Sequence, residues 1–183
     1  MIDEKNICNP PNIMNELMEM PRSRWGHVSG FIESKLIVCG GTTDVADAME
    51  PTNTCDAFCA AKQNWTKIDS MEERRHGAVG VSLFGKLYVM GGHNGIYITN
   101  TVEVFDVMKK VWSHSPEMPL ALTGHCAVAH EDSIIVMGGT LDNERQSKSV
   151  FLFNVTKGTW SELNQMKQAR SGHGCSIKTR YII

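Results

Sequence analysis

The sequence predicts an all-β fold assembled from a repeated four-stranded antiparallel unit, and three observations support this. Short β-branched and aromatic runs end in two glycines at residues 37–41, 88–92 and 135–139, which is the composition of a buried strand. A Phe followed seven residues later by a Trp recurs three times, as Phe58 and Trp65, Phe105 and Trp112, and Phe153 and Trp160. The spacing varies mainly between each double glycine and the next Phe, as expected when insertions fall on one face of a stacked repeat.

The spacing divides the chain into a single domain of consecutive units. The expected boundaries are a half unit at 1–19, unit one at 20–68, unit two at 71–115, unit three at 118–163 and an incomplete unit four at 166–183. Four strands are expected in each full unit. In unit one they are placed near residues 27–32, 35–40, 54–59 and 64–68.

The recurring residues are interpreted as the scaffold of each unit. A double glycine permits positive φ and close backbone approach at the end of the second strand. The Phe and Trp side chains are expected to fill the gap between neighbouring sheets. The scaffold residues are Gly40, Gly41, Phe58, Trp65, Gly91, Gly92, Phe105, Trp112, Gly138, Gly139, Phe153 and Trp160. The histidines beside the lead-in glycines are interpreted as structural too, namely His27, His76, His125 and His173.

Three segments of unit two carry a family resemblance: residues 71–77 (Met-Glu-Glu-Arg-Arg-His-Gly), 88–95 (Tyr-Val-Met-Gly-Gly-His-Asn-Gly) and 102–106 (Val-Glu-Val-Phe-Asp). They resemble the kelch repeat, most closely that of the kelch-like (BTB-kelch) adaptors of cullin ubiquitin ligases. The resemblance implies a β-propeller in which each unit is one blade. Three full blades with a half blade at each end predict a partial propeller, although the two halves could combine into one composite blade. Open blade faces at the ends predict self-association, with two copies paired into one larger ring.

Function is expected in the segments that differ between units. The variable loops 42–53, 93–100 and 140–149 differ in charge and polarity. Tyr97 and Arg145 are the expected anchors for a protein or peptide, because aromatic and Arg side chains dominate interface hot spots. The alternative is that these loops are merely solvated. The predicted partner-binding residues are Arg24, Asp44, Arg75, His93, Asn94, Tyr97, Asp142, Arg145 and Arg170.

The resemblance implies a protein-interaction module that recognises substrates for a cullin ubiquitin ligase. The sequence carries no BTB domain for the ligase contact, so the chain alone is expected to bind a client without delivering it. A cytoskeletal, actin-binding or scaffolding kelch protein is the alternative. A propeller enzyme and a non-functional truncated fragment are the less favoured interpretations.

Net charge, cysteine spacing and the absence of catalytic motifs limit the partners, cofactors and activities that are expected. A formal net charge of -2 over 183 residues gives no reason to expect nucleic acid or an anionic membrane. Cys55 and Cys59 have no second pair at metal-ligand spacing, so neither a metal nor another cofactor is expected. No nucleophile or phosphate-loop motif occurs, so no enzymatic activity is expected. Cys39, Cys126 and Cys175 fall within expected strands, which favours free buried thiols and a cytoplasmic location.

Overall fold

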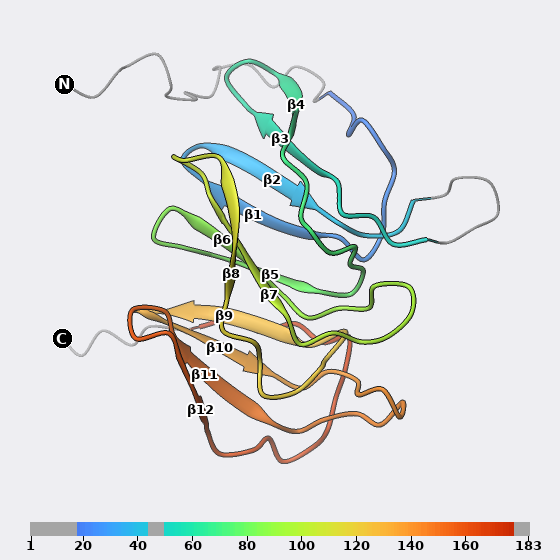
Figure 1. The fold of residues 1–183 in the computed structure, drawn as a ribbon, viewed down its shortest axis with the longest axis vertical. Helices are drawn as coiled ribbons and strands as arrows, with labels where there is room; N and C mark the ends of the chain where they lie inside the picture. The colour runs from blue at the N-terminus through green and yellow to red at the C-terminus, as the bar shows by residue number, and fades with distance from the viewer. Residues whose placement is uncertain (1–17, 44–49, 178–183) are drawn as a thin grey trace.

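The computed structural model describes residues 18–43 and 50–177, which form three four-stranded antiparallel sheets with strands in sequence order (Figure 1). The first sheet contains β1 (Val28–Ile32), β2 (Lys35–Cys39), β3 (Cys55–Cys59) and β4 (Asn64–Ile68). The second contains β5 (Val79–Leu83), β6 (Lys86–Met90), β7 (Val102–Asp106) and β8 (Val111–Ser115). The third contains β9 (Cys126–His130), β10 (Ser133–Met137), β11 (Val150–Asn154) and β12 (Thr159–Glu162).

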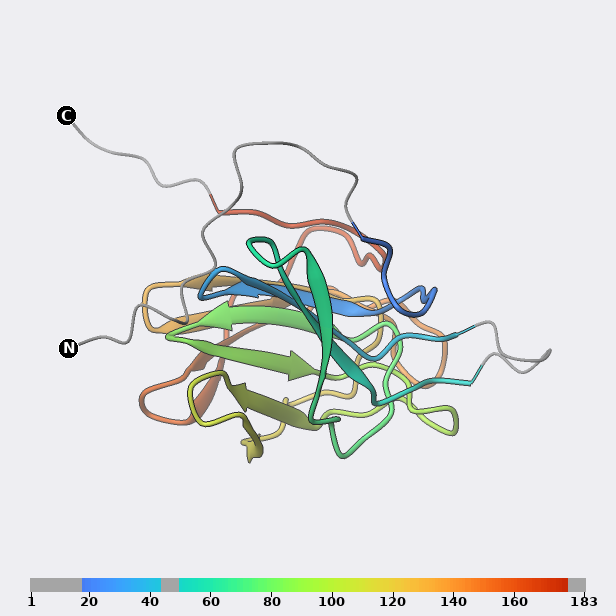
Figure 2. The same ribbon diagram turned by 90° about the horizontal axis from the view of Figure 1, so that it is seen from above.

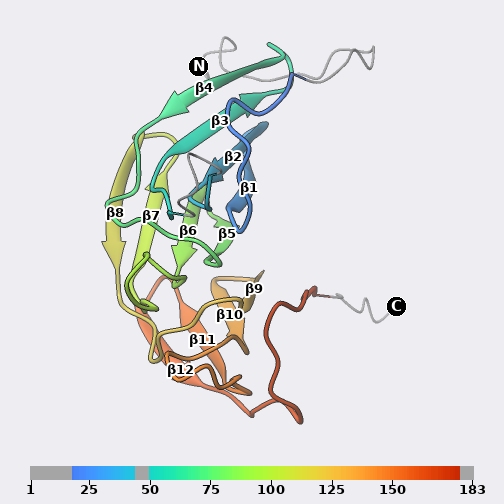
Figure 3. The same ribbon diagram turned by 90° about the vertical axis from the view of Figure 1, so that its right-hand side faces the viewer.

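The three sheets stand side by side as blades arranged in an open arc. Figure 3 shows β1, β5 and β9 on the inner side of the arc and β4, β8 and β12 on the outer side. Along the inner side, β1 contacts β5 and β5 contacts β9. The predicted all-β partial propeller with three four-stranded blades is therefore confirmed. The predicted leading half unit (1–19) lies almost wholly outside the described residues, and the described part of unit four, up to residue 177, contains no strand.

The connections between strands gather on two opposite sides of the molecule. The β2–β3, β6–β7 and β10–β11 loops extend to the right in Figures 1 and 2, whereas the β1–β2, β5–β6 and β9–β10 hairpins lie to the left. We call the first side, together with the lead-in segment that precedes each blade, the loop face. The second side is the hairpin face.

The aromatic pairs occupy equivalent positions in the three blades. Each Phe is the register partner of its Trp across the third and fourth strands, with ring centroids 5.1, 5.1 and 4.7 Å apart. Each half-buried indole N–H also donates a hydrogen bond to a carbonyl of the segment before the blade. The acceptors for Trp65, Trp112 and Trp160 are Met18, Asp69 and Pro116, at 3.1, 2.8 and 3.0 Å.

The double glycines end β2, β6 and β10 where each blade meets the next. Gly92 has a φ of 96°, and its N–H donates to the carbonyl of Leu122 at 2.8 Å. A Cβ on Gly91 would lie 2.5 Å from the same oxygen, closer than atoms can approach. Gly41 and Gly139 donate in the same way to Arg75 and Arg170. The first glycine of each pair is therefore required by the close approach of the next blade. A Cβ on the second glycine would instead collide with its own blade, as at Gly92, where it would lie 2.9 Å from the carbonyl oxygen of His76.

A second set of glycine contacts links the lead-in segments to one another. Gly77 N–H donates to the carbonyl of Gly26 at 2.9 Å, Gly124 to Gly77 at 2.8 Å, and Gly172 to Gly124 at 2.8 Å. One backbone hydrogen bond therefore joins each lead-in to the preceding one. We call this series the glycine ladder.

The expectation of free thiols is wrong. Cys39 forms a disulfide with Cys55, and Cys126 forms one with Cys175. No cysteine among the described residues is a free thiol. Cys39 ends β2 and Cys55 begins β3 as its register partner, with Cα atoms 4.2 Å apart. The lead-in to unit four brings Cys175 back to β9, where the Cα atoms of Cys126 and Cys175 are 6.1 Å apart. The paired cysteines are 16 and 49 positions apart in the sequence, and the repeat pattern alone does not show that they lie together in the fold.

Candidate protein-binding surface

A buried ion pair supports the loop face in blade one. Arg24 Nη2 donates to Oδ2 of Asp56 at 2.7 Å, and the side chains are 0% and 4% exposed. Arg24 Nη1 also donates to the carbonyls of Gly40 and Thr54, both at 3.0 Å. Desolvation lowers the pKa of Arg24 below its usual value, and the neighbouring Asp56 opposes this shift. The guanidinium therefore joins the first and last residues of the β2–β3 loop, Gly40 and Thr54.

Blade two repeats this arrangement with a longer acid. Arg75 donates to the carboxylate of Glu103 through Nη2 at 3.0 Å and through Nε at 3.3 Å. Its Nη1 donates to the carbonyls of Gly91 and Thr101. Glu103 also accepts the backbone N–H groups of Glu72 and Glu73, at 2.7 and 3.1 Å.

Blade three replaces the ion pair with apolar side chains. Leu122 stands at the position of Arg24 and Arg75, and Phe151 stands at the position of Asp56 and Glu103. Leu122 is fully buried and Phe151 is 5% exposed. The position of Glu72 is Pro119 in blade three, and proline has no N–H that needs an acceptor. In blades one and two each buried charge is therefore paired, whereas blade three has no buried charge at these positions and no N–H at the position of Glu72.

Two of the predicted binding arginines belong to this frame. The side chains of Arg24 and Arg75 are 0% and 1% exposed. Their guanidinium groups are held by the carbonyls and carboxylates of their own blades, so they cannot reach a partner in this structure. Arg170 has the same place in the repeat, but it is exposed. Its guanidinium has no salt bridge within the described residues.

The β6–β7 loop contains a hydrogen-bonded turn formed by two of the predicted binding residues, His93 and Asn94. Asn94 Oδ1 accepts the N–H groups of Ile96 and Tyr97, both at 3.0 Å, and Asn94 Nδ2 donates to Glu73 at 3.0 Å. His93 Nδ1 accepts the N–H of Gly95 at 3.0 Å. Asn94 and His93 therefore hold the turn, which presents the side chains that follow them.

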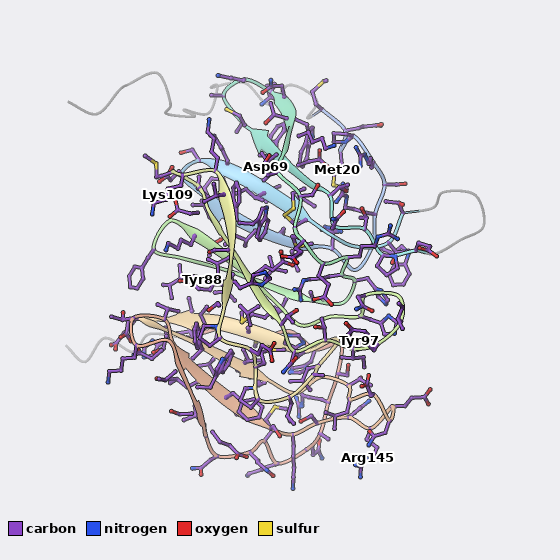
Figure 4. All side chains as sticks on the ribbon, in the orientation of Figure 1. Met20, Asp69, Tyr88, Tyr97, Lys109 and Arg145 are labelled. Carbon is purple, nitrogen blue, oxygen red and sulfur yellow. A yellow bond between two sulfur atoms is a disulfide. The ribbon has the colours of Figure 1, made fainter. Side chains whose placement is uncertain are left out.

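The exposed tip of this loop is apolar and aromatic. Ile96 is 86% exposed and Tyr97 is 52% exposed. The next N–H, that of Ile98, donates to Asp142 Oδ1 at 3.1 Å, so Asp142 links the loops of blades two and three. Arg145 is exposed in the β10–β11 loop. Figure 4 shows Tyr97 and Arg145 on the same side of the molecule, from neighbouring blades.

A row of three rings crosses the loop face from blade one to blade two. The rings of Trp25 and His76 have centroids 5.7 Å apart, and those of His76 and His93 are 5.2 Å apart. Trp25 is 50% exposed. Burial lowers the pKa of His76, and the neighbouring His93 lowers it further. The neutral imidazole of His76 is therefore favoured, and the row presents a continuous aromatic surface.

Sequence reasoning missed Trp25 and Ile96. Trp25 shares its repeat position with His76, Thr123 and Ser171, directly after Arg24, Arg75, Leu122 and Arg170. Four different residues at one position of a fixed frame could have identified it as variable. Ile96 lies within a loop that was predicted to bind, but an isolated isoleucine gave no signal. The predicted Asp44 lies outside the described residues.

The described residues contain no group of three or more His, Cys, Asp or Glu side chains placed to hold a metal ion. Within that part of the chain, no helix has the length and apolar character needed to cross a bilayer.

Comparison with known proteins places this geometry in a family. The model of the KLHDC2/KLHL20/DRC7 Kelch-repeats domain matches residues 9–183. The chain belongs to this kelch-repeat family. Spermatocyte protein spe-26 of Caenorhabditis elegans is 28% identical over 81% of the chain and 26% of its own length. Kelch-like protein 26 of Danio rerio is 26% identical over 91% of the chain and 28% of its own length.

A solved structure agrees with the fold of this kelch-repeat chain. The structure of YjhT superposes with a TM-score of 0.78 at 19% identity, covering 85% of this chain and 56% of YjhT. The chain spans roughly a quarter of the length of Spermatocyte protein spe-26 and of Kelch-like protein 26. Kelch-repeat relatives of the kelch-like type support a protein-interaction module.

Within residues 18–43 and 50–177, no blade packs on the far face of blade three. In blades one and two, the second and third strands bury four side chains against the next blade, and these include Ile37 and Ala57 at 1% and 5% exposure and Met90 and Val102 at 0% and 1%. The equivalent side chains of blade three are only half buried. They are Ile135, Met137, Val150 and Leu152, and we call them the open face of blade three.

Proposed function

We propose that the loop face binds a protein or peptide segment, with Trp25, Tyr97 and Arg145 as its anchors. The observation that carries the proposal is the exposure of two aromatic side chains beside loops that are already ordered by internal hydrogen bonds. Ordered loops lose little conformational entropy on binding, and aromatic and Arg side chains supply most hot-spot energy. Ile96, Asp142 and Arg170 complete the surface, while His93 and Asn94 shape it.

The proposed role is substrate recognition of the ubiquitin ligase adaptor type, without catalysis. The resemblance of the sequence to kelch-like adaptors supports this role, as does its similarity to Kelch-like protein 26 of Danio rerio. The charged groups Arg24, Asp56, Arg75 and Glu103 are occupied by structural contacts, which also favours binding over chemistry. The contact with a cullin would require a BTB domain elsewhere. A cytoplasmic location is part of this proposal, although the two disulfides do not support it.

Affinity purification with matched variants tests the function. Tyr97→Ala with Arg145→Ala should lose the partner, whereas Lys62→Ala and Lys109→Ala, both exposed on hairpin-face turns, should keep it. A partner retained by the Tyr97 and Arg145 variant would refute the assigned surface. Recovery of a cullin or ubiquitinated clients supports the adaptor role. Co-sedimentation with actin filaments would support the cytoskeletal alternative instead.

We further propose that the open face of blade three packs against a blade of a second copy. Half-buried Ile135 and Leu152 occupy positions that are buried by a neighbouring blade elsewhere in the chain, and exposed apolar faces of this kind favour association. Size-exclusion chromatography with light scattering should show a dimer that Leu152→Lys converts to a monomer. A monomer for the unmodified chain at all concentrations would refute self-association.

A further inference from the structure

A cavity of about 320 Å³ lies between blades one and two, away from the anchors of the loop face. Its walls come from β2, β3 and β4 of blade one and from β7 and the β7–β8 turn of blade two. Ile37, Ala57, Phe105 and Val107 form the apolar part of the lining. This volume lies within the range of small-molecule sites in proteins.

The cavity exists because two side chains of blade one are small. Ile37 and Ala57 are register partners on β2 and β3. Their equivalents in blade two, Tyr88 and Val104, are also register partners. Tyr88 is 7% exposed, and its ring lies edge-on to that of Phe153 of blade three, with centroids 6.5 Å apart. A bulky aromatic ring therefore fills the second blade interface where the first is open.

Positive charge is concentrated at the hairpin end of this cavity. Lys35 begins β2 and Lys110 lies in the β7–β8 turn, and both line the cavity. Neither lysine has a salt bridge within the described residues. In the second interface the equivalent positions are Lys86, which lies 3.9 Å from Asp106, and Gly158. The first interface alone thus combines an open apolar floor with two unpaired ammonium groups.

The opposite end of the cavity carries no excess charge. Lys67 and Asp69 both line it at the end of β4, and their charges offset each other. Figure 4 shows Lys109, the sequence neighbour of Lys110, to the left of Asp69, on the side where the hairpins lie. An anionic group is therefore best placed at the hairpin end, between Lys35 and Lys110.

We propose that this cavity binds a small amphipathic carboxylate. The apolar body of the ligand lies against Ile37, Ala57 and Phe105, and its carboxylate lies between Lys35 and Lys110. Burial of the apolar body supplies most of the affinity. The ammonium groups of half-buried Lys35 and exposed Lys110 add a smaller, salt-sensitive contribution and select the anion.

Octanoate is the probe that tests this site, with 1-octanol as the neutral control. Titration followed by backbone amide NMR should show saturable octanoate shifts at residues 35–37 and 105–110, and weaker effects from 1-octanol. Shifts confined to the open face of blade three, or no saturation, would overturn the proposal.

Two sets of variants distinguish the cavity from general surface adsorption. Ile37→Tyr with Ala57→Val copies the filled interface of blade two, and it should weaken octanoate binding at least tenfold without lowering stability. Lys35→Gln and Lys110→Gln should each weaken binding about two- to fivefold, whereas Lys109→Gln should not. Equal affinity in the filled variant and the unmodified chain would refute the site. If the filled variant does not fold, the lysine series still decides, since equal effects at Lys109 and Lys110 contradict the proposed head-group position.

Discussion

Nη2 of Arg75 lies 3.0 Å from Oε1 of Glu103 inside blade two, where the two side chains are only 1% and 2% exposed. Blade three places Leu122 and Phe151 at the same two positions. Removing one partner of a buried ion pair leaves the other charge uncompensated, whereas replacing both can be nearly neutral. One chain thus contains the charged solution and its apolar substitute.

Arg75→Leu alone should lower the free energy of unfolding by about 3–5 kcal/mol, because it leaves the Glu103 carboxylate buried and unpaired. Adding Glu103→Phe should recover part of this loss. Adding Glu72→Pro should recover more, since it removes an N–H that loses its acceptor and reproduces Pro119 of blade three. Urea unfolding of the single, double and triple variants measures these differences. A double variant as unstable as the sum of the two single variants would show that the two sites are not coupled.

The two disulfides should both contribute to stability, and the one that closes the longer loop should contribute slightly more. Cys39–Cys55 spans 16 residues and Cys126–Cys175 spans 49, which corresponds to about 3 and 4 kcal/mol in the chain-entropy model. Unfolding with and without a reductant measures the loss. Alkylation and mass spectrometry of unreduced protein provide the control, because modification of Cys39 and Cys55 without reduction would contradict the pairing.

The stability should fall between pH 7 and pH 4 because of His125. Burial lowers the pKa of this side chain to about 4 in the folded chain, from 6.5. Over this interval the unfolded chain binds more protons at this site, so acid favours unfolding, and the stabilisation is complete only above the unfolded pKa. The expected loss is about 3 kcal/mol.

Urea unfolding at pH 7.5 and pH 4.5 tests the role of His125. His125→Gln should reduce the difference between the two pH values, whereas His130→Gln, at an exposed position, should preserve it. Carboxylates also titrate toward the acid end, so the comparison between variants is the informative quantity. An unchanged difference in His125→Gln would assign the acid sensitivity to other groups.

Asn94→Ala should loosen the β6–β7 loop without unfolding the blade. The substitution removes the acceptor of the Ile96 and Tyr97 N–H groups, and each neutral hydrogen bond contributes about 1 kcal/mol. Hydrogen exchange at these two amides should therefore accelerate by about fivefold. Asn143→Ala, which removes an acceptor of the Arg145 N–H in the next loop, is the matched control. Unchanged exchange at Tyr97 would show that the loop is held by other contacts.

The blades could be predicted because their physical requirements are local. Gly91 must lack a side chain where Leu122 approaches, and Gly92 must lack one where His76 and Ala78 lie. The Phe105 and Trp112 rings must face each other across neighbouring strands. Each requirement leaves a residue type at a fixed interval. The strands accordingly lie within one or two residues of the expected positions in unit one.

The binding surface was less predictable because it depends on contacts between units. The spacing marked Arg24 and Arg75 as recurrent lead-in residues, but it did not reveal the carboxylates of Asp56 and Glu103 that bury them. Likewise, Cys126 and Cys175 are separated by 49 positions, and only the return of the chain along blade three brings them together. Exposure and pairing over such separations leave no periodic signal.

The glycine ladder makes each lead-in depend on the one before it by the same single bond, from Gly26 to Gly77 and from Gly77 to Gly124. Growth by whole modules is therefore built into the architecture, because nothing in one step records how many steps preceded it. A chain with unit two duplicated in tandem would meet the same hydrogen-bond requirement at its one new junction, and its arc would turn further around the same axis.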